Sequence, residues 1–565
     1  MTTGAHHPLV HVAIAAAALL LEPDRGCAEI VDTNASVRSA NSLIVDIQVT
    51  TGGGAAQAFV TYEAAGVDAL VSGLIPVSAT HTATITIGRL RANTAYTYTV
   101  NAIDDSGDPA GTARGSFSTG PLPPAVSMIS FTLKGRTTVP LVILPLLILP
   151  TVQAFAGVEP FRGYIALDLH APDAPQIVWY YSNAPSSASG IPQVDPVGSI
   201  VRERNGNFLF ADAGSGPPPL AADSFFREIA PDGTVLAESP ADCAVTPPGS
   251  TGPAHWIWGQ GNDVAEQLLP GADGVPGTIL HLGKIVKDPF FDAGLAPQGT
   301  RLQLGATIRR WDLSAGTDEV VWDPFVFLDP LTGRTDPANS DPGANSNSRI
   351  PMACAGASLQ VEDWMHANSI QAAPSGVILI SLRHLDSLLA ISPGFHSIAW
   401  RIGGAGSDFA FPNPADRFYH QHFARMLDNG NLLLVDNGNG RPVAEGGQYT
   451  RALEIALDWK SMVATKVWEY RHPAAASDVD TAYKYADKVG SAERLENGNS
   501  LVLFGADVDP TTLLVRDPQT FTLVEADASP EAAAVAVLDI QIPGNFPIYR
   551  ALAVETLFGE FPETK

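Results

Sequence analysis

Residues 363–384 read DWMHANSIQAAPSGVILISLRH, and this stretch contains the pattern from which the fold and the site are predicted. A Pro-Ser-Gly turn precedes an apolar strand at 377–382, which ends in Arg383. Side chains two apart in an extended segment point the same way, so His366 and Asn368 are predicted to share one face. The turn would return Arg383 beside them, and such a group suits an anionic, tetrahedral substrate. The alternative is a polar hairpin at a sheet edge.

The same turn and strand recur along the chain from about residue 160. The turn is often Asn-Gly, which suits a type I′ hairpin because both central residues need positive φ. Each unit can hold four short strands, and no unit could bury both of its faces alone. Radial stacking would bury them, so a six-bladed β-propeller is predicted for residues 159–565. The turns begin at Asn205, Gly277, Ser375, Asn429 and Asn497.

Composition agrees with an all-β chain. Among 565 residues there are 51 Gly and 45 Pro, and only 16% are charged, while helical periodicity is scarce. Residues 29–120 alternate apolar and polar positions and resemble a fibronectin type III-like β-sandwich, with Tyr96 placed like its corner tyrosine. Residues 121–158 are predicted to be a linker with an apolar segment at 139–152. Three prolines argue against a membrane helix there and favour a buried strand or linker, with a membrane or partner contact left open.

Charge and cysteine content limit the partners. A net charge of −26 argues against nucleic acid, which requires clustered Lys and Arg. The apolar run Leu9–Leu21 ends in a Glu-Pro-Asp break and predicts a signal segment at residues 1–28, hence a periplasmic or secreted protein. Cys243 and Cys354 could form a disulfide or be buried thiols. No ligand spacing indicates a metal, and no cofactor is predicted.

Three motifs together resemble those of the bacterial arylsulfate sulfotransferase family that does not use phosphoadenosine phosphosulfate. They are D-W-x-H-x-N-S at 363–369, S-x-R-H at 381–384, and Q-H-x-A at 421–424 followed by D-N-G at 436–438. The resemblance implies an N-terminal β-sandwich followed by a six-bladed propeller over about residues 29–565. It also implies phenolic sulfate donors and phenolic acceptors.

The resemblance also implies roles for single residues. His422 would be the nucleophile, and His366, Asn368 and Arg383 would hold the sulfuryl oxygens. Two further residues lie outside these motifs. His255 would be an additional catalytic histidine, although Trp256 replaces the second histidine of the family's usual pair, and Tyr549 would lie near the mouth of the channel. His384 is a further candidate for substrate binding, and its alternative is to brace the loop.

The predicted reaction transfers a sulfuryl group from a phenolic sulfate ester to a phenol through a sulfohistidine on His422. A neutral imidazole is a competent nucleophile near pH 7, and positioning and charge stabilisation would do most of the work. The alternatives are a non-catalytic propeller that binds a glycan or protein, and an aryl sulfate hydrolase. The hydrolase is disfavoured because no Cys/Ser-x-Pro-x-Arg motif occurs. The natural substrates and the oligomeric state, including a homodimer, stay open.

Overall fold

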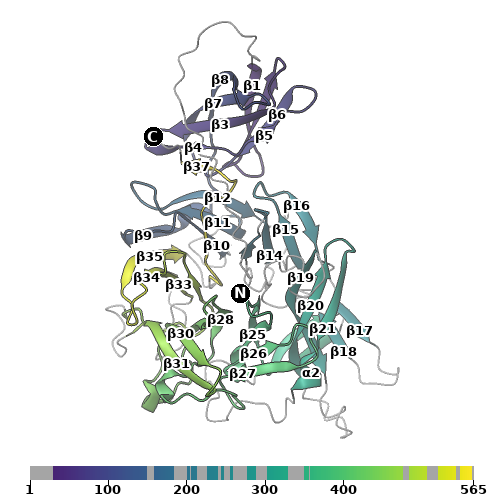
Figure 1. Cartoon of the computed structure of the whole chain (residues 1–565), viewed down its shortest axis with the longest axis vertical. Coiled ribbons are helices and arrows are strands. Elements are labelled where there is room, and N and C mark those ends of the chain that lie inside the picture. The colour runs from purple at the N-terminus through teal and green to yellow at the C-terminus, as the bar shows by residue number, and fades with distance from the viewer. Residues whose placement is uncertain are drawn as a thin grey trace. The chain divides into compact units, whose positions relative to one another are not determined.

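The chain divides into two compact units, residues 1–120 with 558–565 and residues 121–557. The computed structural model describes residues 30–148, 158–182, 200–203, 205–212, 225–239, 243–246, 255–258, 277–287, 302–328, 349–354, 357–474, 483–505, 519–542 and 548–562. Strands predominate in both units (Figure 1). The prediction of an all-β chain is therefore confirmed. The predicted signal segment lies outside the described residues.

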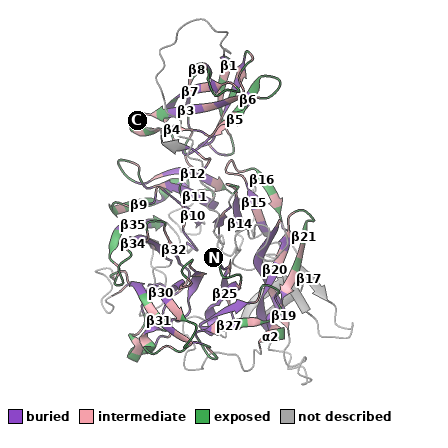
Figure 2. Cartoon of the chain, in the orientation of Figure 1, coloured by how far each residue is buried: buried purple, intermediate pink, exposed green. Residues whose placement is uncertain are grey.

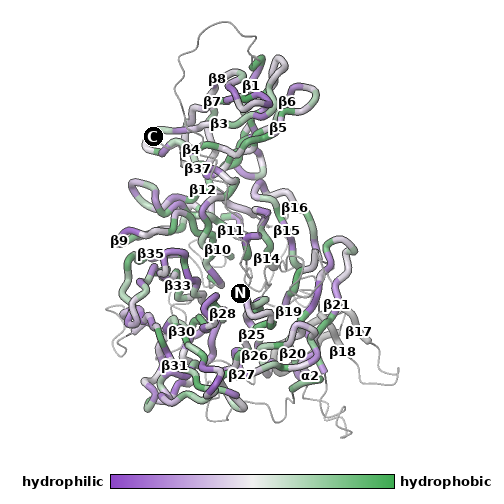
Figure 3. Tube along the Cα trace, in the orientation of Figure 1, coloured by the Kyte–Doolittle hydropathy of each residue, from purple (hydrophilic) through white to green (hydrophobic). Residues whose placement is uncertain are grey.

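The first unit contains a three-stranded and a six-stranded sheet. The first has the order β1 (Ile30–Val37), β2 (Val45–Thr51), β6 (Thr82–Ile87). The second has the order β37 (Phe561–Pro562), β4 (Val67–Val71), β3 (Gln57–Ala64), β7 (Ala95–Ile103), β8 (Pro109–Ser118), with β5 (Ile75–Pro76) paired to β3. Alternate residues of β2, β6 and β7 are buried, and both hydrophobic and hydrophilic residues occur along these strands (Figure 3).

Tyr96 makes the contact that its position in the sequence suggests. Its hydroxyl oxygen accepts a hydrogen bond from the backbone N–H of Arg91 at 2.9 Å, and its ring stacks on Phe117 with centroids 5.3 Å apart. A corner tyrosine bonds to the backbone a few residues upstream in this way. The likeness of the whole unit to a fibronectin type III domain stays a prediction.

The last residues of the chain belong to the first unit. Strand β37 pairs with β4, and a Cβ atom at Gly88 would lie 1.9 Å from the ring of Phe558. The sequence assigned residues 558–565 to the second domain, whereas the structure groups them with the first. A two-residue strand is too short for a period-two pattern to reveal its partner.

The second unit has six sheets among the described residues. In chain order, the first sheet has the strand order β12 (Gln176–Ser182), β11 (Phe161–Asp168), β10 (Leu141–Ile148), β36 (Leu552–Val554). The second has the order β13 (Ile200–Arg202), β14 (Phe208–Asp212), β15 (Phe225–Ile229), β16 (Val235–Glu238). The third has the order β17 (Cys243–Thr246), β18 (His255–Trp258), β19 (Thr278–Lys287), β20 (Leu302–Asp312), β23 (Ala357–Asp363), β22 (Arg349–Cys354), and β21 (Thr317–Trp322) also pairs with β20. The short helix α2 (Pro324–Phe327) follows β21.

Three further sheets complete the unit. They are β24 (Ala367–Ala372), β25 (Ile378–Leu382), β26 (Ser387–Ile391), β27 (Ile398–Ile402); then β28 (His422–Met426), β29 (Leu432–Asp436), β30 (Arg451–Asp458), β31 (Val463–Tyr470); then β32 (Ser491–Arg494), β33 (Ser500–Phe504), β34 (Gln519–Ala526), β35 (Ala534–Ile542), β9 (Ser130–Gly135). Figure 1 shows the sheets of this unit following one another around a common centre.

Hydrophobic clusters join successive sheets from the second to the sixth. In β25, Ile380 packs in the cluster shared with the third sheet, whereas Leu379 packs in the cluster shared with the fifth. In β29, Leu434 faces the fourth sheet and Leu433 faces the sixth. Such strands are buried on both faces, which is why their sequences are continuous apolar runs rather than alternating ones.

The two ends of the second unit meet in shared sheets. Strand β36 pairs with β10, and β9 pairs with β35. The backbone N–H of Ala551 also donates to Ser491 Oγ at 3.1 Å, which connects the first and sixth sheets. Every residue of β10 is buried (Figure 2), so the described part of the apolar segment is a buried strand. Within the described residues, no helix is long and apolar enough to cross a membrane.

One hydrogen-bonded turn occurs three times among the described residues. Asn431 Nδ2 donates to Glu454 Oε1 at 2.6 Å, and the Asn431 N–H donates to Asn429 Oδ1 at 2.9 Å. The equivalent amide-to-carboxylate pairs are Asn207 with Glu228 and Asn499 with Glu525, each at 2.6 Å. In each case the turn joins the first two strands of a sheet, and the glutamate lies on the third. The repeat seen in the sequence is therefore a structural one.

The Asn-Gly turns differ from the predicted type. Gly430 has φ +83°, but Asn429 is not among the residues with positive φ. The Gly430 N–H donates to Leu427 O, and the Leu427 N–H donates to Asn431 O. This is a three-residue hairpin loop with glycine in the left-handed position, so the prediction of type I′ is wrong. The asparagine side chain bonds forward to the turn backbone, which favours the right-handed conformation.

We expect Asn431→Ala and Asn499→Ala to lower stability by similar amounts, about 1–2 kcal/mol each. Each change removes the amide that pairs with a buried glutamate. Thermal unfolding monitored by circular dichroism gives the midpoint of each variant and checks this prediction. An unchanged midpoint in both variants would show that the repeated contact does not stabilise the sheets.

Candidate active site

The β24–β25 hairpin brings the first predicted residues together. Ala367 pairs with Leu382, and the Arg383 N–H donates to His366 O at 3.1 Å. His366 itself precedes the strand, with φ +45°, and a bulge separates it from the regular pairing. The expected extended geometry from His366 to Asn368 is therefore wrong, because the chain turns sharply at His366.

Asp363 binds two imidazole rings. Its Oδ2 lies 2.5 Å from His366 Nδ1, and its backbone oxygen lies 2.8 Å from His384 Nδ1. The ring centroids of His366 and His384 are 4.7 Å apart. Burial alone would raise the pKa of Asp363, but the charge and hydrogen bond of His366 hold it well below its usual range. Asp363 is therefore a carboxylate that accepts hydrogen bonds.

The orientation of His422 is fixed by an amide. Asn437 Nδ2 donates to the backbone oxygens of Ala486 and Val489 at 2.8 and 3.0 Å, so its Oδ1 must be the acceptor. His422 Nδ1, 2.6 Å from that oxygen, therefore carries the proton. The Val489 N–H approaches His422 Nε2 at 3.4 Å. The lone pair of the ring is thus on Nε2.

The loop at 486–489 also holds Arg383. Arg383 Nη2 donates to Asp487 O at 2.9 Å, so one short loop contacts the guanidinium, the His422 ring and its amide partner. Burial, and then the charge of Arg383, lower the pKa of His422 well below its ordinary value. His422 is therefore neutral near pH 7, as a nitrogen nucleophile must be.

His384 is also neutral. Burial, and then the charge of His366, lower its pKa to about 3. The ring Nδ1 of His384 bonds to Asp363 O, and its backbone N–H donates to Met365 O. The residue thereby braces the turn that carries Arg383. A direct contact of His384 with substrate stays a prediction.

Asn368 and Tyr549 are neighbours. Tyr549 Oη donates to Asn368 O at 3.0 Å, and Asn368 Nδ2 donates to Gln421 O at 2.7 Å. These contacts connect β24, the segment before β28 and the last part of the second unit. The Gln421 side chain donates in turn to Ser381 Oγ at 3.0 Å, which fixes the segment next to His422.

His420 lies beside the same group. Its ring centroid is 6.0 Å from that of His384, and its backbone N–H donates to Asp386 Oδ1 at 2.6 Å. The ring is buried, and its Nε2 has no hydrogen-bond partner among the described residues. Asn368 Oδ1 is another buried atom of this kind. Buried polar atoms without partners require an explanation, and a bound polar ligand is one.

Backbone strain is concentrated here. Ten non-glycine residues in the described part of the chain have positive φ. Five of them lie in or next to the contacts above: His366, Asp386, His420, Phe423 and Val489. A β-branched residue such as Val489 rarely adopts this conformation, and strained residues cluster at functional sites.

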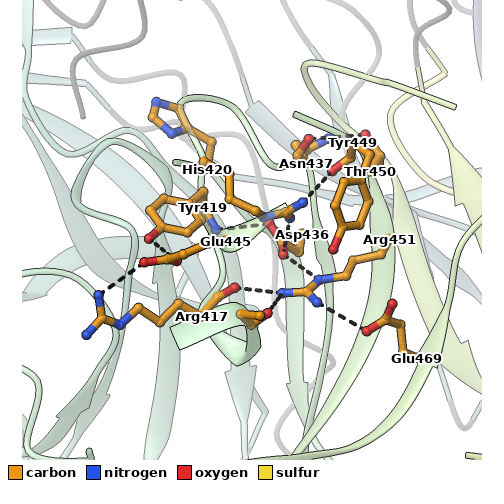
Figure 4. Close-up of polar contacts among 12 residues, drawn as sticks. Arg417, Tyr419, His420, Asp436, Asn437, Glu445, Tyr449, Thr450, Arg451 and Glu469 are labelled. Atoms are coloured by element: carbon orange, nitrogen blue, oxygen red, sulfur yellow. Dashed lines mark hydrogen bonds and ion pairs between the residues drawn. The ribbon is translucent and has the colours of Figure 1, made fainter. Parts of the chain in front are cut away.

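A buried ion-pair network joins β29 and β30, the two strands that follow the strand of His422 in its sheet (Figure 4). Asp436 Oδ2 accepts from Arg441 Nη2 at 2.5 Å and from Arg451 Nε at 2.8 Å, and all three side chains are fully buried. Asp436 Oδ1 accepts from the Tyr419 N–H at 2.9 Å. Gly438 follows with φ +75°, and a Cβ there would lie 2.2 Å from Tyr449 O. The Asp-Asn-Gly motif is thus required by packing as well as by the site.

A metal is a poor fit to this group. Asp363, His366 and His384 offer ligand atoms within 4.8 Å of one another. However, the 2.5 Å contact between Asp363 and His366 is a hydrogen-bond distance, shorter than the roughly 3 Å between two ligands about 2 Å from one ion. The arrangement is that of a carboxylate–imidazole pair.

The structure does not describe the side chains of some residues that the sequence analysis named. The side chain of His255, on β18, lies outside those described, as do the side chains of Cys243 and Cys354. Sequence reasoning quoted Asp363 and Asn437 within motifs but assigned them no role. The Asp-x-x-His spacing at 363–366 is the signal that could have indicated the first, and nothing local indicated Val489.

One protein family matches part of this chain. Residues 303–545 match the arylsulfotransferase (ASST) family. This range is shorter than half of the chain, but it contains the described contacts of His366, Arg383 and His422. It supports the predicted arylsulfotransferase family, and it ends before Tyr549.

The solved structures that match this chain have low identity to it. A protein of unknown function from Bacteroides caccae is 13% identical, covers 74% of this chain and 100% of its own, and has a TM-score of 0.33. A catalytically inactive virginiamycin B lyase from Staphylococcus aureus with quinupristin is 10% identical, covers 73% of this chain and 99% of its own, and has a TM-score of 0.26. No curated protein matches the chain.

We expect Asp436→Asn to lower the free energy of unfolding of the second unit by about 3–5 kcal/mol, because it leaves the fully buried Arg441 without its carboxylate and Arg451 with Glu469 alone. Thermal unfolding monitored by calorimetry measures the loss. A matched control is Asp408→Asn, which removes a carboxylate that accepts a hydrogen bond at a more exposed position. Equal shifts for both variants would contradict the importance assigned to the buried network.

Proposed function

We propose that the chain transfers a sulfuryl group from an aryl sulfate to a phenol, with His422 as the nucleophile. The family match supports an arylsulfotransferase. The observation that carries the finer proposal is the state of the His422 ring. It is buried and neutral, its Nδ1 proton is donated to Asn437, its Nε2 accepts from the Val489 N–H at the long distance of 3.4 Å, and the charge of Arg383 helps to lower its pKa. These are the properties of an activated imidazole nucleophile next to an anion-binding group.

The chemistry has two half-reactions. In the first, His422 Nε2 attacks sulfur, the sulfur–oxygen bond to the aryl group breaks, and the phenol leaves after it takes up a proton. In the second, an acceptor phenol gives up a proton and attacks sulfur, and the electron pair of the nitrogen–sulfur bond returns to Nε2. Donor and acceptor use the site in turn, which predicts ping-pong kinetics.

The other residues would bind the sulfuryl oxygens. Arg383 presents a planar guanidinium, which can contact two oxygens of a sulfate monoester in a way that a lysine cannot. Asn368 has one amide hydrogen beyond the one given to Gln421. Because the group being transferred is already electron-poor at sulfur, positioning and charge stabilisation account for most of the rate.

The proposed scaffold is a six-bladed propeller that follows a β-sandwich. Six sheets in the second unit, packing between successive sheets, the recurrent Asn–Glu turn, and the pairing of β36 with β10 support the propeller. In such a fold the innermost strands converge, so residues from different sheets can form one site. The apolar run Leu9–Leu21 supports export to the periplasm or the exterior.

The central test uses 4-nitrophenyl sulfate as donor with and without a phenol acceptor. We expect release of 4-nitrophenol to depend on the acceptor and to survive EDTA, because no step requires a metal. His422→Ala should lower kcat/KM by about 10⁴-fold or more, since the nucleophile is lost. Arg383→Lys should lower it by about 100-fold.

The matched control for this test is His396→Ala, an exposed imidazole outside the site, which should transfer at the wild-type rate. Release that ignores the acceptor would indicate a hydrolase instead. No release at all from any aryl sulfate would favour a propeller that binds a glycan or a protein.

The lowered pKa of His422 has a measurable consequence. The neutral ring persists at pH values where an ordinary imidazole is protonated, so the first-turnover rate should not fall between pH 7 and pH 5 on account of this group. In Asn437→Asp, a carboxylate would raise the pKa of His422, and the rate should fall as the pH drops through that range. The check is quenched-flow measurement of 4-nitrophenol in one turnover. If the wild-type first-turnover rate instead declines with a midpoint at about pH 6.5, the ordinary imidazole value, the lowered pKa assigned to His422 is contradicted.

A further inference from the structure

The imidazoles of the site differ in the group that accepts their Nδ1 proton. His422 donates to the neutral amide of Asn437 at 2.6 Å. His384 donates to a backbone oxygen at 2.8 Å. His366 donates to a carboxylate, Asp363 Oδ2, at 2.5 Å, whereas His420 Nδ1 lies 3.2 Å from Asp386 Oδ1 without a hydrogen bond. A carboxylate partner stabilises an imidazolium, whereas an amide or carbonyl does so much less.

Asp363 also fixes the position of the His366 ring. Its second oxygen, Oδ1, accepts from the backbone N–H of His366 at 3.1 Å, so the carboxylate binds both the main chain and the ring of one residue. The chain reaches this geometry only because His366 has φ +45°. The Nδ1 atom is therefore committed to Asp363, and Nε2 is the atom that can face a ligand.

Exposure separates His366 from the other rings. Its side chain is 32% exposed, whereas His422, His384 and His420 are 3%, 8% and 2% exposed. A proton carrier must meet both the departing phenol and the incoming one, which enter and leave through solvent. Among these four imidazoles, His366 is the one that is more than slightly exposed to solvent.

We propose that His366 is the catalytic proton carrier of the transfer and that Asp363 is the residue that positions it. This inference rests on the proposed function and divides the work between two imidazoles. His422, whose Nδ1 is bonded to an amide, forms the bond to sulfur. His366, whose Nδ1 is bonded to a carboxylate, moves the proton.

The proton balance follows from that division. As His422 Nε2 bonds to sulfur, the electron pair of the breaking sulfur–oxygen bond goes to the phenolate oxygen. The Nε2 proton of the His366 imidazolium moves to that oxygen, so a neutral phenol leaves and a neutral His366 stays bonded to Asp363. The acceptor phenol then returns a proton to His366 Nε2 as its oxygen bonds to sulfur. No other reactant is needed.

The test compares two donors in Asp363→Asn. 4-Nitrophenol leaves readily as its anion, whereas unsubstituted phenol needs a proton as it departs. With phenyl sulfate we expect kcat/KM to fall by about 10²- to 10⁴-fold, the usual contribution of general acid catalysis. With 4-nitrophenyl sulfate the fall should be about tenfold or less. A merely structural role of Asp363 would lower both rates by the same factor.

Asp386→Asn is the matched control, because it makes the same change at the carboxylate beside His420. Its effect should be equal for the two donors. If Asp363→Asn does not fold, as judged by its thermal midpoint, His366→Gln replaces it and should show the same selective loss. Equal losses for both donors in the folded variant overturn the inference. The proposed function fails separately, if the wild type does not transfer or His422→Ala still does.

Discussion

The buried carboxylate of Asp436 is the constraint on which the site depends. It neutralises two fully buried arginines, Arg441 and Arg451, and such charges are costly without a partner. Arg451 also donates to Arg417 O at 2.7 Å, and Asp436 accepts from the Tyr419 N–H. The network therefore holds the end of β29 and the segment that leads to His422 in one position. Asn437 follows directly, so the amide that orients His422 is placed by the same ion pairs.

Chemical differences between identical side chains arise from their acceptors. Imidazole has no fixed role, since its tautomer and charge follow from what binds Nδ1. In this site an amide, a backbone oxygen and a carboxylate bind three neighbouring rings. Burial leaves two rings uncharged because their neutral acceptors do not offset it, and the carboxylate can hold a charged ring. In the proposed transfer, nucleophile and proton carrier are therefore different rings, because neither ring has to serve both purposes.

Sequence reasoning predicted the strands well and the turns less well. The apolar runs at β25 and β29 and the recurrent Asn-Gly positions indicated repeated sheets, because burial on both faces leaves a strong compositional pattern. The turn type was wrong at Asn429–Gly430, since the choice between two hairpins depends on which partner the asparagine side chain finds. The Asn429 side chain accepts from the Asn431 N–H and donates to Glu454, which lies on the third strand and has no local signal. The place of residues 558–562 in the first unit could not be read locally for the same reason.

The strained residues of the site mark the limit of local reasoning. A strand pattern predicts extended backbone at His366, and a β-branched residue such as Val489 ordinarily has negative φ, yet both have positive φ. Each conformation is unfavourable by itself and persists because the surroundings determine it. For His366 these include both oxygens of Asp363, and for Val489 the bonds of its carbonyl to Asn437 and of its N–H to His422. Such positions depend on contacts between distant segments, whose sequences carry no mutual pattern. The residues that make the imidazoles chemically different are therefore those that local periodicity is least able to identify.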